Sequence, residues 1–202
     1  MRMILLALTA TLLSACSSPS VPDVTYFRLP PPKSLPHAEK PLTLLPIEVE
    51  VFVGEGIYAD QALIYATTPD ANALRSYHYQ VWSDPPTRAL RDRLTIALRD
   101  SGISPLVSDR LPASTQALRV HGSIARYERI KREAGFVVVV TLDLRIDQDQ
   151  GEPLIEKTYS AEVPAADATI PATVAAFGTA IDQAFAGFYA DLAALQGGGH
   201  AG

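Results

Sequence analysis

Strict alternation of apolar residues marks two neighbouring segments in the second half of the chain, residues 117–129 and 136–147. Side chains of a β-strand point alternately to opposite faces, so a period of two predicts strands with one buried face. That face comprises Leu118, Val120, Gly122 and Ile124 in the first segment and Val138, Val140, Leu142, Leu144 and Ile146 in the second. Residues 131–135 predict the turn between them, and residues 154–163 predict a third strand at a charged sheet edge. The chain therefore folds around an antiparallel meander.

Shorter strands are predicted in the first half of the chain. Residues 24–29 form a β-type run, which Pro30 ends because proline cannot donate a hydrogen bond to a neighbouring strand. A half-buried strand with one acidic face is predicted where Ile47, Val49, Val51 and Val53 alternate with Glu48, Glu50 and Phe52. Residues 62–65 and the aromatic-rich residues 76–82 predict two more strands.

Two segments have the apolar spacing of a helix. In the first, Leu90, Leu94, Ala97 and Leu98 form one stripe; Asp84 is the predicted N-cap, Pro85 the first helical residue, and Gly102 the end. Residues 103–107 predict a strand that returns after this helix. The second is a long helix over residues 171–195, whose apolar residues step by three or four.

These elements predict an α/β (α+β) fold, with a mixed, largely antiparallel sheet and two amphipathic helices packed on one face. The opposite sheet face is predicted to be solvated or to meet a partner, since it carries Glu48, Glu50, Arg119, His121, Asp143 and Arg145.

The N-terminus has the three parts of a secretory signal peptide. A positive start at Arg2 precedes an apolar run over residues 4–13, and small residues then lead to Cys16, the single cysteine. The run is too short for a membrane-spanning helix, which needs roughly 20 apolar residues. The sequence Leu13-Ser14-Ala15-Cys16 resembles a bacterial lipobox, in which cleavage after Ala15 leaves Cys16 as an acylated N-terminus. The alternative is an ordinary signal peptide that contains a cysteine.

We therefore divide the chain into residues 1–15 as signal peptide, 16–23 as lipidated cysteine and tether, 24–196 as one periplasmic domain, and 197–202 as a disordered glycine-rich tail. Two or three acyl chains on Cys16 make the anchor permanent. A tether of about seven residues, at roughly 3.3 Å each, reaches little more than 20 Å, so the domain stays close to its membrane. By resemblance to lipoproteins of enteric-type bacteria, Ser17 favours export to the outer membrane.

Composition excludes several function classes. A net charge of −5 gives no basic surplus to neutralise phosphates, so we expect no nucleic-acid partner. With Cys16 acylated, no cysteine remains for a disulfide or a thiolate metal site. The four histidines have no metal-ligand spacing, and no G-x-S-x-G motif is present. We expect no metal, no catalytic residues and no cofactor besides the lipid on Cys16. The basic residues 126–132, interrupted by Glu128, are interpreted as a solvated hairpin end.

Four aromatic residues are candidates for a partner-binding face: Tyr26, Tyr77, Tyr79 and Trp82. Tyrosine and tryptophan are favoured interface anchors. The alternative, which we weigh more heavily, is core packing with hydroxyl groups at the edge. For Trp82, the position just before the capped helix favours a structural role.

The order of the parts carries a family resemblance. The lipobox is followed closely by Tyr26-Phe27-Arg28-Leu29, and then by Tyr77-His78 with Trp82 and Pro85 before the first helix. With the hairpin and the C-terminal helix, this order resembles the ABC-type transport auxiliary lipoprotein family, the Pqi-type outer-membrane lipoproteins. Gln80-Val81 departs from the His-Arg pair that often precedes the tryptophan in that family, so no role of that pair carries over.

The resemblance implies a non-enzymatic docking component of an intermembrane lipid-transport system, held at the periplasmic face of the outer membrane. Its implied partners are an MCE-domain (mammalian cell entry) protein and an inner-membrane ABC transporter or permease, and a homo-oligomer is among the expected assemblies. One alternative is a lipid carrier or another envelope-assembly lipoprotein. The carrier would hold its ligand between helices and sheet, near Leu142, Phe177, Ile181 and Phe185. An envelope hydrolase is the weakest reading, because no nucleophile–base pairing is recognisable.

Overall fold

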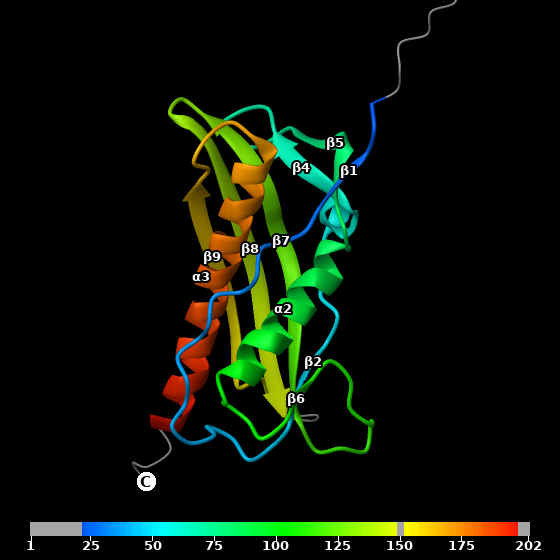
Figure 1. Ribbon diagram of the computed structural model, residues 1–202. Helices are drawn as coiled ribbons and strands as arrows, with labels where there is room; N and C mark the ends of the chain where they lie inside the picture. The colour runs from blue at the N-terminus through cyan, green and yellow to red at the C-terminus, as the bar shows by residue number, and fades with distance from the viewer. Residues whose placement is uncertain (1–21, 149–151, 198–202) are drawn as a thin grey trace, which may run out of the picture.

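The fold, seen in a computed structural model that describes residues 22–148 and 152–197, is a curled sheet covered by helices. In these residues nine strands form one mixed sheet, which curls into a half-barrel, and two α-helices pack on one of its faces (Figure 1). The predicted fold class is confirmed. The predicted signal peptide, Ala15, Cys16, most of the tether and the tail beyond residue 197 lie outside the described residues.

Strand β7 is the centre of the sheet. It pairs antiparallel with β8 along its whole length, and its other edge pairs in parallel with β2, β3 and β4. Beyond these, β9 pairs with β8, β6 with β2, β5 with β4, and β1 with β5. The strands are β1 Thr25–Phe27, β2 Ile47–Val49, β3 Val53–Gly54, β4 Ala62–Ala66, β5 Leu74–Trp82, β6 Val107–Ser108, β7 Leu118–Arg132, β8 Gly135–Gln148 and β9 Ile155–Pro164. The helices are α2 Pro86–Asp100, α3 Ile170–Gly197 and a 3-10 turn, η2, Gly56–Ala59.

The core lies between the sheet and the two helices, as the apolar spacing predicted. All five alternate residues listed for β8 and the stripe of α2 are buried, and so are Phe177, Ile181 and Phe188 of α3. Three rings from different elements meet at its centre: Trp82 lies 5.2 Å from Phe177 and 5.7 Å from Tyr127, and Tyr127 lies 4.5 Å from Phe177 between centroids.

The predicted strand over residues 47–53 is wrong in its second half. It breaks into β2 and β3, and Phe52 is buried while Val51 and Val53 are exposed. The reason is one extra residue: Val49 pairs with Val120, but Val53 pairs with Ser123, three positions further along β7 rather than four. An odd insertion inverts which alternate residues face the core.

A second irregularity lies in β7 at Ala125, where the register with β8 shifts between Ile124 and Arg126. Beyond it Tyr127 faces the core, and Glu128, Arg129 and Ile130 are also buried. The interpretation of residues 126–132 as a solvated hairpin end is therefore wrong for these positions. The turn is also tighter than the predicted 131–135, because Arg132 pairs directly with Gly135.

The ends of α2 differ slightly from the prediction. Pro85, rather than Asp84, is the N-cap residue, and Pro86 is the first helical residue. Gly102 follows the helix with a φ of +69°, as a C-terminal glycine should. The predicted strand over residues 103–107 is reduced to β6. The carbonyl of Ile103 instead accepts hydrogen bonds from the backbone N–H groups of Leu42 and Thr43 in the strap loop.

Gly122 makes room for Phe52, and this contact is testable. A Cβ at Gly122 would lie 2.6 Å from three atoms of the Phe52 ring. We expect Gly122→Ala to lower the free energy of unfolding by about 1–3 kcal/mol through overpacking. In a Phe52→Ala background the same change should cost much less, because the ring is gone. Urea unfolding of the four variants measures the coupling, and an equal cost in both backgrounds would contradict it.

Candidate functional site

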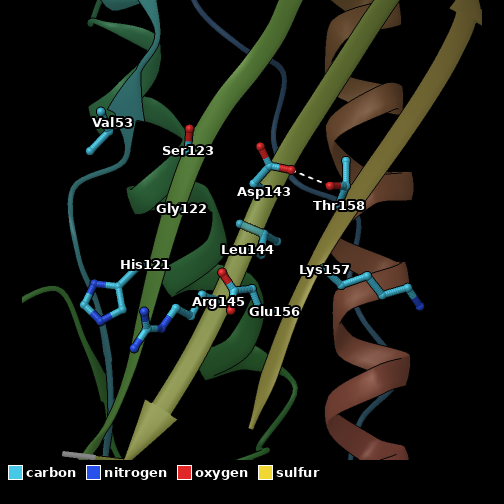
Figure 2. Close-up of a pocket in the computed structure, with 10 residues that line it drawn as sticks. All are labelled: Val53, His121, Gly122, Ser123, Asp143, Leu144, Arg145, Glu156, Lys157 and Thr158. Carbon is cyan, nitrogen blue, oxygen red and sulfur yellow. Dashed lines mark hydrogen bonds between the residues drawn. The ribbon is translucent and has the colours of Figure 1, made fainter. Parts of the chain in front are cut away.

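A polar groove crosses the sheet face opposite the helices. It has a volume of about 660 Å³ and is lined by β7, β8 and β9, with Val53 at one side (Figure 2). This is the charged face that the alternation predicted. Here Glu48 pairs with Arg119 at 3.3 Å, and the Thr158 hydroxyl donates to Asp143 at 2.5 Å.

His121 lies between two carboxylates in this groove. Its Nδ1 is 3.0 Å from Oε2 of Glu50, and its Nε2 is 3.5 Å from Oδ1 of Asp147. Arg145 donates to the second oxygen of Asp147 at 2.7 Å. Asp147 itself is buried, and its ion pair with Arg145 compensates its desolvation.

This arrangement does not form a nucleophile–base pair. Ser123, the serine of the groove, donates to Glu55 at 3.3 Å, whereas both ring nitrogens of His121 face carboxylates. Within residues 22–148 and 152–197, no three His, Cys, Asp or Glu side chains are placed to hold a metal ion. The groove is best described as a network of paired charges on a solvated face.

Two further polar links hold elements against the sheet. Tyr58 of η2 donates to buried Glu128 at 2.8 Å, and burial, followed by this hydrogen bond, raises the pKa of the Tyr58 hydroxyl. At the edge strand, Asp191 of α3 accepts from Lys157 and Tyr159 at 2.7 Å each. These bonds, led by that from Lys157, lower the pKa of Asp191, whereas burial and then Asp191 raise the pKa of Tyr159.

The four aromatic candidates occupy different environments. Tyr26 is 66% exposed on β1, whereas Trp82 is 3% exposed and packs in the core. Tyr77 is half-buried and its hydroxyl accepts from Arg129 at 2.9 Å; Tyr79 is also half-buried. The pairing of Tyr26 with Val81 brings Tyr26 near Trp82. A role of the four residues in partner binding stays a prediction, with Tyr26 the most accessible of them.

The residues suggested for a lipid between helices and sheet are packed core residues. Leu142, Phe177, Ile181 and Phe185 are all 0–2% exposed, and none of them lines the groove or the two cavities described below.

Residues 28–46, which we call the strap, connect β1 to β2 and run across α3 (Figure 1). The strap is clamped at Pro30 by Arg93, a buried residue of α2. The Arg93 guanidinium also pairs with Asp182 of α3 at 2.7 Å, and Asp182 accepts from the backbone N–H of Lys33 at 3.2 Å. Gly178 lets the strap approach α3, because a Cβ there would overlap Cγ of Pro30. One ion pair thus joins both helices to the strap.

The strap ends at an apolar surface at the opposite end of the domain from β1 (Figure 1). We call this surface the leucine end; it comprises the exposed residues Leu44, Leu106, Leu154 and Leu195. A cavity of about 190 Å³ opens there, with Leu154 and Leu195 on its wall beside Leu42, Leu45 and Leu192. Sequence reasoning missed this surface, although the leucines of residues 42–45, which lie between prolines in a predicted loop, were a signal.

Comparison with protein families gives a match over residues 30–186 to the ABC-type transport auxiliary lipoprotein component family. The chain belongs to this family. The match covers most of the chain and includes nearly all of the strap, helix α2, the complete meander, and α3 as far as residue 186. The predicted resemblance is confirmed. The family description assigns the protein to the auxiliary lipoproteins of ABC-type transport systems.

Solved structures similar to this auxiliary lipoprotein show the same fold. A Xanthomonas campestris protein of the DUF330 family has a TM-score of 0.72 at 18% identity, covering 86% of this chain and 98% of its own. An uncharacterized protein has a TM-score of 0.62 at 16% identity, with coverage of 79% and 99%. A hypothetical protein from Chlamydia trachomatis has a TM-score of 0.54 at 7% identity, with coverage of 76% and 98%. Comparison with curated proteins gave no significant match.

No helix in the described part of this auxiliary lipoprotein is both long enough and apolar enough to cross a membrane. Attachment through acyl chains on Cys16 agrees with the family description and stays a prediction, since Cys16 lies outside the described residues.

Because Arg93 is buried and joins both helices to the strap, replacing it should lower the stability of the fold substantially. Arg93→Met should lower the free energy of unfolding by about 3 kcal/mol or more, because Asp182 is left without its charged partner. The exposed Arg88→Met on the same helix is the matched control, expected within about 0.5 kcal/mol of wild type. Denaturant unfolding checks both. Hydrogen exchange should also speed up at Phe27 and Lys33 in the Arg93 variant alone, and equal effects of the two variants would refute the clamp.

Proposed function

We propose that this auxiliary lipoprotein is a non-enzymatic docking component at the periplasmic face of the outer membrane. It is anchored through Cys16 and binds an MCE-domain protein that carries lipids from an inner-membrane ABC transporter. One observation carries the proposal: the membrane tether enters at β1, whereas the exposed leucines gather at the opposite end of the domain.

The tether sets which end stays near the membrane. Pro22, where the described chain begins, is six positions after Cys16, a distance of at most about 20 Å along an extended chain. Helix α3, 28 residues long, runs toward the leucine end and is about 42 Å long at 1.5 Å per residue. The domain can therefore present the leucine end tens of ångströms from the anchoring membrane, where a partner that bridges the periplasm would arrive.

The leucine end has the chemistry of a protein-docking surface. Leu44 is 86% exposed. Leu154 and Leu195 line one cavity, and Leu44 lies in the chain between Thr43 and Leu45 of the same cavity wall, so these exposed leucines are neighbours rather than scattered singly. The cavity of about 190 Å³ has room for one or two large apolar side chains. The occupant that fits is a segment of the MCE-domain protein that inserts such a side chain, as interface anchors do.

Affinity capture from detergent-solubilised envelopes tests the docking function. Wild type should co-purify an MCE-domain protein and ABC transporter components, identified by mass spectrometry. Leu44→Asp should reduce recovery of the MCE-domain protein by about 10-fold or more, because it places a charge on the most exposed residue of the leucine end. Val53→Asp, which changes another strongly exposed apolar residue, should leave recovery unchanged.

Two further variants separate the anchor from the interface. Cys16→Ala should reduce capture of the MCE-domain protein from solubilised envelopes, because the variant is not held at the membrane. It should leave binding between the two purified proteins in detergent solution intact. Tyr26→Ala should bind normally if docking occurs at the leucine end, and its failure would place the interface at β1 instead. Capture of no transport component by wild type would overturn the transport assignment itself.

A further inference from the structure

A second cavity lies beneath β1, on the helix-covered side of the sheet, and belongs to neither surface described above. It has a volume of about 280 Å³, and its wall includes Phe27 and Leu29 next to the tether, Ile96 of α2, and Trp82 and Tyr127 of the core. At roughly 30 Å³ for each water-sized group, it holds about nine such groups. This is near the lower end of the size range of small-molecule sites.

Two polar atoms in this wall lack a hydrogen-bond partner. They are Nε1 of Trp82 and the hydroxyl of Tyr127, and their side chains are 3% and 2% exposed. Buried donors are nearly always paired in folded proteins, so these two orphans need an explanation. Trp82 and Tyr127 are also neighbours, with ring centroids 5.7 Å apart.

The cavity wall carries charges of both signs, from Arg28 and Arg93 and from Asp84 and Asp92. The guanidinium of Arg93 is held in place by Asp182. The N-terminus of α2 begins at Pro86 in the wall, and its N-cap residue Pro85 makes no side-chain hydrogen bond to the first turn. Helix N-termini carry a partial positive charge. Burial raises the pKa of the Tyr127 hydroxyl, which therefore stays protonated and able to donate.

From these observations we propose that the cavity binds an acyl compound, with its carboxylate or ester oxygen at Trp82 and Tyr127 and its chain along Phe27, Leu29 and Ile96. Both polar atoms are shielded from water, so the ligand reaches them through a small shift of side chains in the wall. The exposed acidic residues Asp84 and Asp92 also line the cavity; Asp92 is paired with Arg91 at 2.6 Å. The site is independent of the docking function proposed above.

Trp82 is the single tryptophan of the chain, so its fluorescence reports directly on the site. The probes are octanoate, methyl octanoate and octyltrimethylammonium, added to the chain from residue 16 carrying Cys16→Ala. Octanoate or its methyl ester should shift the Trp82 emission in a saturable way, and octyltrimethylammonium, which has the chain but no acceptor oxygen, should not. Binding of octanoate alone indicates a free fatty acid, and binding of the ester indicates an acylated lipid. Absence of binding by both, or equal binding of the ammonium probe, overturns the proposal.

Tyr127→Phe separates ligand binding from a structural role. It keeps the ring and removes the unpaired hydroxyl, so it should weaken binding of the effective probe by about 10-fold or more. It should also raise the Tm of the ligand-free protein by about 2–6 °C, because no buried polar atom is left unpaired. Tyr159→Phe is the matched control: its hydroxyl is bonded to Asp191, so the Tm should fall while binding stays unchanged. A Tyr127→Phe protein with wild-type affinity, or with a lowered Tm, would overturn the assignment.

Discussion

Hydrogen bonding on both edges of β7 is the constraint on which the rest of the structure depends. One edge pairs with β8 over the whole strand, and the other pairs in turn with β2, β3 and β4. Because strand side chains alternate with a period of two, a single-residue irregularity, in β7 or in a segment that pairs with it, exchanges the buried and exposed positions of the strand that carries it. One irregularity places Phe52 against Gly122, and the other, at Ala125, turns Tyr127 into the core. The central aromatic cluster and the cavity beside it follow from that second shift.

The sequence was sufficient where local periodicity decides the structure. The alternation of β8 and the apolar stripes of α2 and α3 predicted the buried residues of those elements, and with them the fold class. It failed where the outcome depends on a distant partner. The inversion at Phe52 depends on the register with β7, about 70 residues away in the sequence. The only sign of it in the sequence was Gly122, a glycine inside the β7 strand pattern. The burial of Arg93 was not predicted, because Asp182, its partner, is 89 positions away.

The candidate surfaces were less predictable than the fold for the same reason. The charged sheet face was predicted, since strand alternation places Glu50, His121 and Arg145 on one face, but the groove in that face was not. The leucine end was not, because loops, a strand start and a helix end contribute its residues and no periodicity links them. Trp82 was recognised as a notable residue, but only the three-dimensional structure shows that its indole nitrogen lacks a partner.

The strap gives a physical reason to expect communication between the two ends of the domain. Its first residues, Arg28 and Leu29, line the cavity beneath β1. Near its other end, Leu42, Thr43 and Leu45 line the cavity of the leucine end. Between them it is held by Arg93 at Pro30 and by the backbone N–H of Ala38, which donates to Ser101 at 2.8 Å. Prolines restrict its φ angles, so a displacement at β1 is poorly absorbed by local bending. A ligand that shifts Phe27 must either break the Arg93 contacts or move the strap as a unit, and the second course changes the leucine cavity. The energy of the clamp therefore sets how strongly the two sites can be coupled.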